Sequence, residues 1–233
     1  MIKCTVITSI YNSELFLSKF IDELISFQKI EDIEFLLLHI KPNEKEKDII
    51  KTTIDIRNKR IRYIELFEQE GLYTTWNRGI ELAAGEYIAI WNVDDIRTIE
   101  GLKEQIRILD DNPEIGLTYG NFYQVKKQIK DCSNPYIVTS GHNNKTFMEG
   151  CHLTCFPMWR KSIHKTIGFF DEQFKIAGDY DFQIRIAQNY KFGKTINNLG
   201  WYYIGNSSKL SSNWRKMMIE HSVIGLRYKY YKI

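Results

Sequence analysis

Short apolar segments alternate with amphipathic segments along the first 120 residues. Five short segments are predicted as strands: residues 2–9, 33–40, 61–66, 87–91 and 116–119, of which 87–91 is free of charge and 33–40 is nearly all apolar. The segments between them, whose pattern and end signals fit helices, are residues 13–28, 44–57, 71–84 and 98–111. Strands that alternate with helices through short connections form doubly wound, mostly parallel sheets with helices on both faces. We therefore expect an α/β fold of this kind.

The second half of the chain is less regular. We predict helices at 160–167, 177–190 and 209–230, and a hairpin-like pair of strands at 194–204. Gly85, just after the helix at 71–84, is interpreted as its C-cap.

The composition argues against several classes of protein. The chain is 43% hydrophobic and 26% charged, an ordinary globular balance, and its net charge of +3 gives no support for nucleic-acid binding. It lacks an apolar run long enough to span a membrane, and its first residues lead directly into a strand, which predicts no signal peptide. Its four cysteines are Cys4, Cys132, Cys151 and Cys155, and we expect reduced thiols in a cytoplasmic protein.

Polar residues follow several of the predicted strands. Because parallel strands end at one edge of their sheet, residues 8–12, 39–43 and 92–95 should meet there. Asp94 and Asp95 repel each other, so a divalent cation, a basic side chain or water should lie beside them. The alternative is a solvated pair that caps the helix from Thr98. The sequence has no glycine-rich dinucleotide or phosphate-loop motif after its first strand, which argues against both of those classes.

A second acidic cluster, Asp179 and Asp181, precedes or begins the helix at 177–190. Carboxylates favour a helix N-terminus on electrostatic grounds alone, which is one interpretation. The other is that one of them is a general base that deprotonates a hydroxyl group. Together with a metal at Asp94 and Asp95, such a base would make a metal-assisted group-transfer site.

Five segments in the same order resemble motifs of family 2 glycosyltransferases, which have the GT-A fold. They are the opening strand at 5–12, the Gly-x-x-x-Ala-x-Asn-x-Gly-like helix at 71–80, the strand and metal motif at 85–95, the Gly-x-Phe-Asp-Glu-like segment at 159–172, and the base motif at 178–185. From the first to the last they extend over residues 5–185, most of the length of the chain. The resemblance implies a single GT-A-like domain over 1–233, with a nucleotide-sugar half at 1–120 and an acceptor half with the C-terminal helix at 121–233.

The resemblance also implies roles for individual residues. Asp179 aligns with the catalytic base, and Asp95 with the residue that binds Mn²⁺ or Mg²⁺; Asn206 stands where a second metal ligand is expected. The residues implied near the donor are Thr8, Tyr11, Asn12, Asn77, Arg78 and Asp94. The residues considered for the acceptor side are His152, Trp159 and Asp181, and Trp76 could also stack on a ring. For His152 and the two tryptophans, ordinary packing is the alternative.

The family differs from this chain at several of these positions. Its members usually have an Asp-Asp-Gly-Ser-like turn after the second strand, where this chain has His39-Ile-Lys-Pro-Asn43. Asn92 stands at the start of the metal motif in place of Asp, and Gly178 precedes the base in place of Glu. Because of this turn, the resemblance does not identify the base of the donor nucleotide, and a UDP-sugar is the first expectation.

The function that the resemblance implies is that of an inverting, metal-dependent hexosyltransferase of polysaccharide biosynthesis. It would move a sugar from a nucleotide-diphosphate donor to a saccharide or lipid-linked acceptor. A sugar nucleotidyltransferase and a non-catalytic nucleotide- or sugar-binding module are the alternatives. The basic and aromatic tail from Trp214 suggests peripheral contact with the inner face of a membrane; a terminal helix packed on the domain is the other interpretation.

Overall fold

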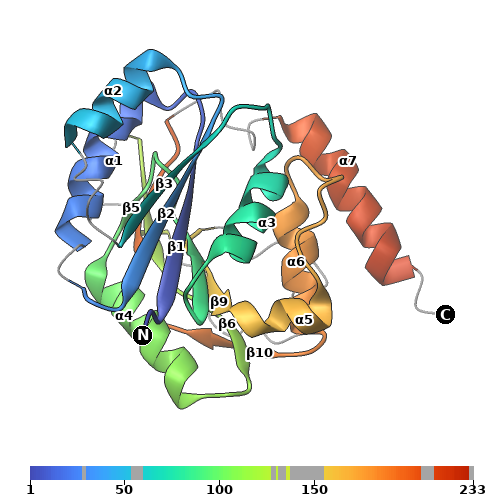
Figure 1. Cartoon of the computed structure of the whole chain (residues 1–233). Helices are drawn as coiled ribbons and strands as arrows, with labels where there is room; N and C mark the ends of the chain where they lie inside the picture. The colour runs from blue at the N-terminus through green and yellow to red at the C-terminus, as the bar shows by residue number, and fades with distance from the viewer. Residues whose placement is uncertain are drawn as a thin grey trace.

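A seven-stranded sheet, in the order β10-β6-β9-β4-β1-β2-β3, forms the centre of the computed structural model (Figure 1). The structure describes residues 1–27, 30–53, 60–126, 130, 135–136, 155–205 and 213–230. The strands of this sheet are β1 (Cys4–Ile10), β2 (Ile33–Ile40), β3 (Ile61–Leu66), β4 (Tyr87–Ile90), β6 (Ile115–Tyr119), β9 (Met158–Arg160) and β10 (Lys191–Lys194). All neighbouring strands are parallel except β9, which is antiparallel to both β4 and β6. The expected GT-A-like, mostly parallel α/β fold is therefore confirmed.

Helices cover both faces of the sheet and form two separate hydrophobic cores. The helices of one face are α1 (Glu14–Phe27), α2 (Glu44–Thr53) and α4 (Ile99–Asp111), and those of the other are α3 (Leu72–Leu82), α5 (His164–Ile167) and α6 (Gly178–Ala187). Side chains alternate between the two cores along each strand, as the pleat requires. In β2, Phe35 and Leu37 face the α1 side, whereas Leu36 and Leu38 face the α3 side. Burial on both faces explains the continuous apolar runs in the sequence.

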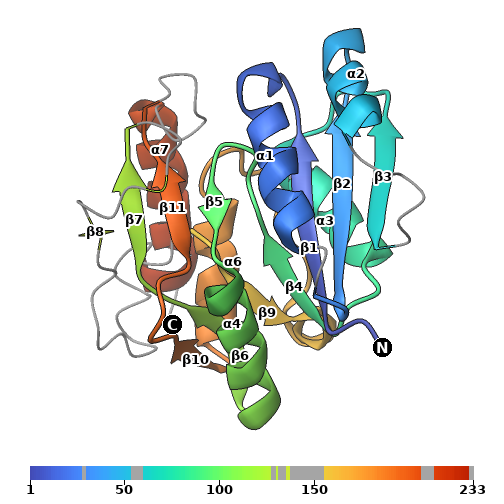
Figure 2. The same ribbon diagram turned by 90° about the vertical axis from the view of Figure 1, so that its left-hand side faces the viewer.

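A second sheet, in the order β5-β11-β7-β8, lies beside the first (Figure 2). Its strands are β5 (Ile96–Arg97), β7 (Phe122–Val125), β8 (Pro135–Tyr136) and β11 (Gly200–Tyr203). The predicted hairpin at 194–204 is wrong, because β10 and β11 belong to different sheets: β10 pairs with β6 and β11 with β7. Long-range pairing overrides the local pattern here. The strand β9 was also not predicted, since three residues are too few to give a periodic signal.

The connections around β4 differ from the sequence-based expectation in two ways. Asp94 and Asp95 do not cap α4; Thr98 is the N-cap, and its Oγ1 accepts a hydrogen bond from the backbone N–H of Gly101 at 3.1 Å. Gly85 is not the C-cap of α3, which ends at Leu82 with Ala83 as C-cap. A Cβ atom at Gly85 would lie 2.4 Å from the backbone nitrogen of Thr5, so glycine is needed for close approach to β1.

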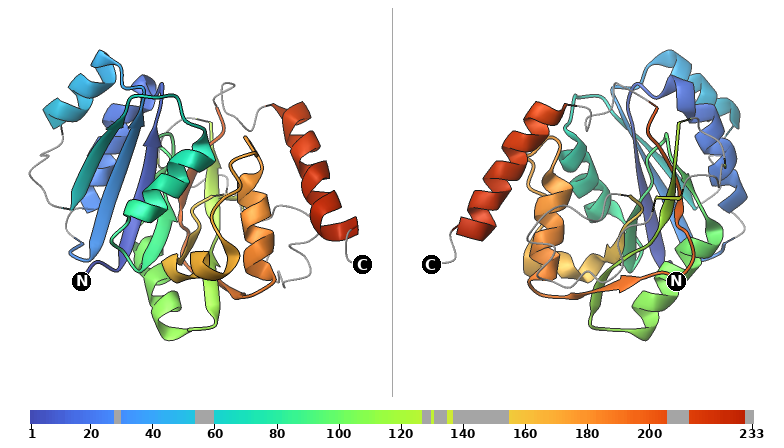
Figure 3. Two further views of the ribbon diagram at one scale, coloured as in Figure 1. Left: turned by 45° about the vertical axis from the view of Figure 1, so that its right-hand side comes forward. Right: turned by 180° about the vertical axis from the view of Figure 1, so that it is seen from behind.

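The chain then forms a short 3₁₀ turn, η2 (Lys161–Ile163), and, near its end, α7 (Trp214–Gly225) followed by the π-helical turn η4 (Leu226–Tyr230). The helix α7 lies on the outside of the molecule beside α6 (Figure 3). Within α7, all of whose residues are described, only Ile224 is fully buried. Among the helices described, none combines the length and apolar character needed to cross a membrane.

Candidate active site

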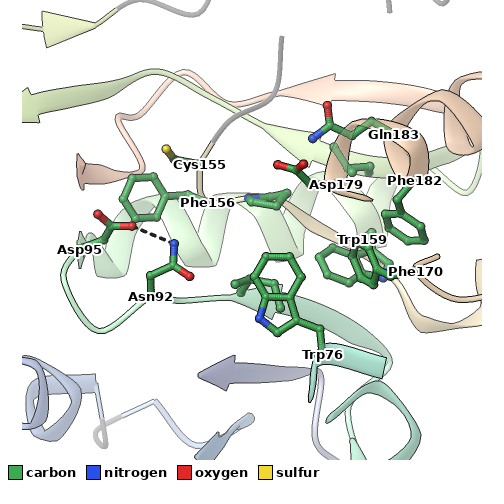
Figure 4. A pocket seen from close by; sticks show the side chains of 13 residues that line it. Trp76, Asn92, Asp95, Cys155, Phe156, Trp159, Phe170, Asp179, Phe182 and Gln183 are labelled. Atoms are coloured by element: carbon green, nitrogen blue, oxygen red, sulfur yellow. Dashed lines mark hydrogen bonds between the residues drawn. The ribbon is translucent and has the colours of Figure 1, made fainter. Parts of the chain in front are cut away.

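A pocket opens between the end of β4, the start of α6 and the segment that enters β9 (Figure 4). Asn92 and Asp95 lie at one end of it, and Asp179 and Gln183 of α6 at the other. The remaining lining residues are mostly apolar or aromatic: Trp76, Ile90, Leu117, Cys155, Phe156, Pro157, Trp159, Phe170 and Phe182. The parallel strands β1, β2 and β4 point their carboxyl ends to this edge, as predicted. The fold thus brings one carboxylate of each predicted acidic cluster, Asp95 and Asp179, to one cavity.

Asp95 is held in place by contacts on both carboxylate oxygens. Its Oδ2 accepts a hydrogen bond from the Asn92 amide at 3.1 Å, and its Oδ1 accepts one from the backbone N–H of Tyr203 in β11 at 3.1 Å. The indole N–H of Trp91 donates to the Asp95 carbonyl oxygen at 3.0 Å. Trp91 itself is buried, as expected of a core residue. The carboxylate of Asp95 is only 2% exposed and is therefore fixed before any ligand arrives.

The oxygen atoms near Asp95 fit a hard divalent cation. Mg²⁺ typically takes one or two carboxylates from a protein and completes its shell with substrate phosphates and water. Asp95 supplies one such carboxylate at the pocket, and the adjacent Asp94 is half-buried and does not line it. In the part of the chain that the structure describes, there is no group of three His, Cys, Asp or Glu side chains around a common point. Asp95 can therefore contribute one ligand to an ion whose remaining ligands come from a substrate phosphate and water. Asn206 lies outside the described residues.

Asp179 stands at the first turn of α6 with its carboxylate at the pocket. Its Oδ1 accepts hydrogen bonds from the backbone N–H of Tyr180 at 2.9 Å and from the hydroxyl of Tyr73 at 3.3 Å. The Tyr73 hydroxyl also lies 2.8 Å from the carbonyl oxygen of Ile176, so the tyrosine from α3 fixes the chain on both sides of the helix start. Tyr73 was not predicted, because only the tertiary structure brings α3 to α6.

Burial raises the pKa of Asp179 to about 6, and this loss of hydration outweighs the hydrogen bonds that favour its charged form. The nearby carboxylate of Glu220 raises the pKa further. A carboxylate with a pKa near neutrality is both ionised in the resting protein and basic enough to take a proton from a hydroxyl group. The geometry and the pKa thus fit a general base.

Gly178 is explained by the position of Tyr73. A Cβ atom at Gly178 would lie 2.7 Å from the Tyr73 ring, which is too close for any side chain unless the ring or the helix start shifts. Glycine in this position is therefore matched to the tyrosine that hydrogen-bonds the candidate base. This gives a structural reason for one of the departures from the family pattern.

The predicted donor residues do not line this pocket. Thr8 is buried in β1, and its hydroxyl has no hydrogen-bond partner among the described residues. Tyr11 and Asn12 follow β1 on the exposed edge, with Asn12 in the left-handed region at φ 48°. Arg78 is exposed and pairs with Glu70 at 2.5 Å.

Asn77 is used inside the protein. Its amide accepts from the backbone N–H of Phe170 and donates to the carbonyl oxygen of the same residue, each at 2.9 Å. It also donates to Glu172 at 2.9 Å, so it fixes the segment before α6 against α3. Asn77 could therefore influence donor binding only through the position of this segment, and not by direct contact.

The turn after β2 contains a closed network instead of a free acidic residue. His39 and Glu46 are both fully buried, and the His39 Nε2 lies 3.1 Å from the Glu46 Oε2. The Asn43 side chain donates to the same carboxylate at 2.7 Å, and the backbone N–H of Ser13, just after β1, also donates to it. Tyr63 of β3 contacts the His39 Nδ1 at 2.8 Å. The network joins the ends of β1, β2 and β3.

The acceptor-side predictions fall in three different places. Trp159 borders the pocket but is only 1% exposed, and its indole N–H donates to the His164 Nε2 at 2.9 Å. The structure does not bring the Asp181 carboxylate to the pocket, because it is completely buried and binds Arg185 at 2.9 Å and Arg227 at 2.8 Å. His152 lies outside the described residues. Trp76 does line the pocket, and its indole N–H has no partner among the described residues.

Comparison with known proteins agrees with the sequence resemblance. The model of the family described as Glycosyl transferase family 2 matches residues 5–168, more than half of the chain. An uncharacterized glycosyltransferase of Methanocaldococcus jannaschii is 28% identical over 120 residues, which are 51% of this chain and 41% of that protein. Glycosyltransferase GlyG of Streptococcus pneumoniae is 29% identical over 128 residues, covering 51% of this chain and 42% of the relative. The chain spans less than half of the length of these relatives.

Solved structures share the fold at low sequence identity. TarS of S. aureus in complex with UDP-GlcNAc superposes with a TM-score of 0.73 at 16% identity, over 97% of this chain and 67% of that one. A mannosyltransferase of Pyrobaculum calidifontis, solved with GDP-Man and Mn²⁺, gives a TM-score of 0.66 at 14% identity, over 97% and 63% of the two chains. At these identities the likeness establishes the fold alone.

Proposed function

Because the chain belongs to glycosyl transferase family 2, we propose that it transfers a sugar from a nucleotide-diphosphate donor to a saccharide or lipid-linked acceptor hydroxyl, with inversion. The observation that carries the proposal is the pair of carboxylates, Asp95 and Asp179, at opposite ends of one pocket. One is fixed by hydrogen bonds where a cation with a phosphate would bind. The other is a half-buried carboxylate with a raised pKa. A UDP-sugar is the first donor to test, since solved relatives of the same fold include a complex with UDP-GlcNAc.

The reaction divides between the two ends of the pocket. Asp95, with Asp94, would hold a Mn²⁺ or Mg²⁺ ion, which when bound would neutralise charge on the leaving diphosphate. Asp179 would accept the proton of the acceptor hydroxyl as its oxygen forms the new bond to the anomeric carbon. The bond from that carbon to the diphosphate oxygen breaks, and the nucleoside diphosphate leaves. Because the acceptor and the leaving group occupy opposite sides, one displacement inverts the anomeric centre.

The walls of the pocket suit a sugar ring. Sugars present apolar faces edged by hydroxyl groups, and the aromatic side chains of Trp76, Phe156 and Phe170 offer apolar surface. The Trp76 indole N–H, which has no partner among the described residues, could donate a hydrogen bond to a sugar hydroxyl. We place the donor on the 1–120 half and the acceptor on the 121–233 half, because Asp95 and Asp179 belong to these halves.

Nucleotide titration tests the donor assignment. With manganese, we expect the protein to bind one of UDP, GDP and dTDP in the micromolar range, as isothermal calorimetry would measure, and to bind it more weakly with a chelator present. We expect the matching nucleotide sugar to be turned over to free nucleoside diphosphate. Release of pyrophosphate would instead indicate a nucleotidyltransferase. If the protein bound no nucleotide in either condition, the interpretation as a non-catalytic binding module would replace the proposed transferase.

The outer face of α7 supports the proposed membrane contact. Trp214, Met218, Ile219 and Val223 are 63%, 53%, 64% and 44% exposed, and Arg215 and Lys216 are exposed beside them. An apolar helical face with cations and no acidic residue fits an anionic bilayer surface. Contact there would bring a lipid-linked acceptor close to α6.

Vesicle sedimentation tests this contact. We expect the protein to bind vesicles that contain phosphatidylserine, and to bind neutral ones less. Replacing Ile219 by glutamate should weaken binding about 10-fold or more, because an apolar anchor is lost and a repelled charge is added. Ile196 is 88% exposed in the loop before β11, so Ile196→Glu is the matched control and should bind as the unmodified protein does. Equal binding by both variants would exclude α7 as the contact.

A further inference from the structure

The inner face of α7 is hydrogen-bonded to the segment that leads to Asp179. One carboxylate, that of Glu220, accepts hydrogen bonds from three successive backbone N–H groups: its Oε1 from Lys175 at 2.9 Å, and its Oε2 from Ile176 and Ala177 at 2.8 Å each. Three charge-assisted hydrogen bonds from consecutive amides make a strong and directional contact. It joins residues far apart in sequence, so it exists only in the folded chain.

These hydrogen bonds lie at the start of α6, where the N-cap residue provides no side-chain hydrogen bond. Ala177 is the N-cap residue of α6, and its methyl side chain cannot accept a hydrogen bond from the N–H groups of the first turn. Glu220 reaches in from α7 and binds the N–H groups that lead into the helix. On the opposite side, the Tyr73 hydroxyl lies at 2.8 Å from the Ile176 carbonyl oxygen. The peptide chain two and three residues before Asp179 is therefore held from α3 and from α7.

We propose that Glu220 is a positioning residue for Asp179, and that through it α7 sets the placement and surroundings of the carboxylate in the pocket. This inference rests on the proposed role of Asp179 as general base. Glu220 does not line the pocket and need not touch the substrate. It acts by fixing the backbone from 175 to 177, and hence the first turn of α6.

The titratable and charged groups that face Asp179 determine how its pKa would change if the Glu220 carboxylate were removed. Among the described residues they are Tyr73 from α3, whose hydroxyl lies 3.3 Å from the Asp179 Oδ1, Glu220 from α7, whose charge raises the pKa of Asp179, and Asp95 across the pocket. Without the Glu220 carboxylate, one negative charge near Asp179 disappears and water reaches the loosened helix start. Both changes favour the ionised form, so the pKa of Asp179 should fall.

The test compares Glu220→Ala and Glu220→Gln with a matched pair at Glu104. Glu104 on α4 makes the same kind of contact, accepting from the backbone N–H groups of Ile196 and Asn197 at 2.9 Å each, but its loop does not lead to Asp179. Glu104→Ala should lower the melting temperature as Glu220→Ala does, while the pKa of Asp179 stays where it is. Glu220→Gln can keep part of the contact through its amide oxygen, so its effects should be smaller than those of Glu220→Ala.

Two readouts separate positioning from folding. In carbon-13 NMR of aspartate carboxyl groups, the Asp179 signal, identified by its loss in Asp179→Asn, should titrate about one pH unit lower in Glu220→Ala. In transfer assays, kcat of Glu220→Ala should fall about 10- to 100-fold, because the orientation of Asp179 is lost. KM for the donor should change little, because the substitution does not affect the donor site. The acid limb of its pH profile should also move to lower pH.

The outcomes distinguish this inference from the proposed function. If no nucleotide sugar is turned over but the Asp179 titration moves in Glu220→Ala and not in Glu104→Ala, the positioning holds and the proposed activity fails. If transfer is found but Glu220→Ala keeps both the kcat and the Asp179 titration of the unmodified protein, the positioning is overturned. A shared loss of melting temperature with no shift in titration would likewise assign Glu220 a purely structural role.

Discussion

Replacing Asp179 by asparagine is expected to lower kcat by about 100- to 10,000-fold, the range that a positioned general base contributes. Asparagine has nearly the same shape, and its amide oxygen can keep the hydrogen bonds from the Tyr180 N–H and the Tyr73 hydroxyl. It cannot accept the proton of the acceptor. KM for the donor should change little, because Asp95 and the donor end are untouched. Steady-state transfer assays at saturating donor would measure the loss.

The same substitution should make the protein more stable at neutral pH. The pKa of Asp179 rises from 3.8 to about 6 on folding, so the folded state prefers the neutral carboxyl. That contribution to stability is complete below about pH 4 and is lost as the pH rises through about 6. Above that, the buried charge costs up to about 3 kcal/mol, which asparagine avoids. We expect Asp179→Asn to raise the free energy of unfolding by about 1–3 kcal/mol at pH 8 and to leave it nearly unchanged at pH 4, as urea titrations would show.

The pH dependence of transfer provides a separate check. Since Asp179 must be ionised to act as a base, kcat of the unmodified protein should fall as the pH drops through about 6. An Asp179→Asn variant that retained full activity, or that lost activity and stability together, would contradict the assignment. The first result would remove Asp179 from the chemistry, and the second would make it a structural carboxylate.

The sequence was informative where structure is local. The strands predicted at 33–40 and 61–66 agree with β2 and β3 to the residue, and Thr98 marks the start of α4 as the pattern indicated. Asp95 and Asp179 were singled out because acidic residues at a strand end and at a helix start are visible in the sequence, and their roles stay predictions. The rule that parallel strands end at a common edge predicted this position for residues 92–95 only. Asp179 lies in the same pocket because α6 packs against that edge.

The parts that could not be predicted depend on contacts between distant residues. The strand β9 is three residues long and is defined by its partners β4 and β6, which the sequence does not identify. Tyr73 and Glu220 contact the segment before Asp179 only because α3 and α7 pack against α6. Asp181 shows the converse: its place in an acidic motif suggested the pocket, but Arg185 and Arg227 hold its carboxylate elsewhere. A motif gives residue types and spacing, and tertiary packing decides which side chains reach the cavity.

Replacing Asp95 by asparagine should lower kcat/KM about 100- to 1,000-fold and remove most of the dependence on manganese, because metal charge stabilisation is worth several kcal/mol. The fold should survive: the asparagine carbonyl can accept from the Tyr203 N–H, and the Asn92 amide can turn to present its oxygen. Asp94→Asn is the matched control, since Asp94 is adjacent but less buried, and its loss should be smaller. Calorimetry should show that manganese strengthens nucleotide binding in the unmodified protein but not in Asp95→Asn. If manganese strengthened binding equally in both, the ion would bind elsewhere and Asp95 would only connect the end of β4 to β11.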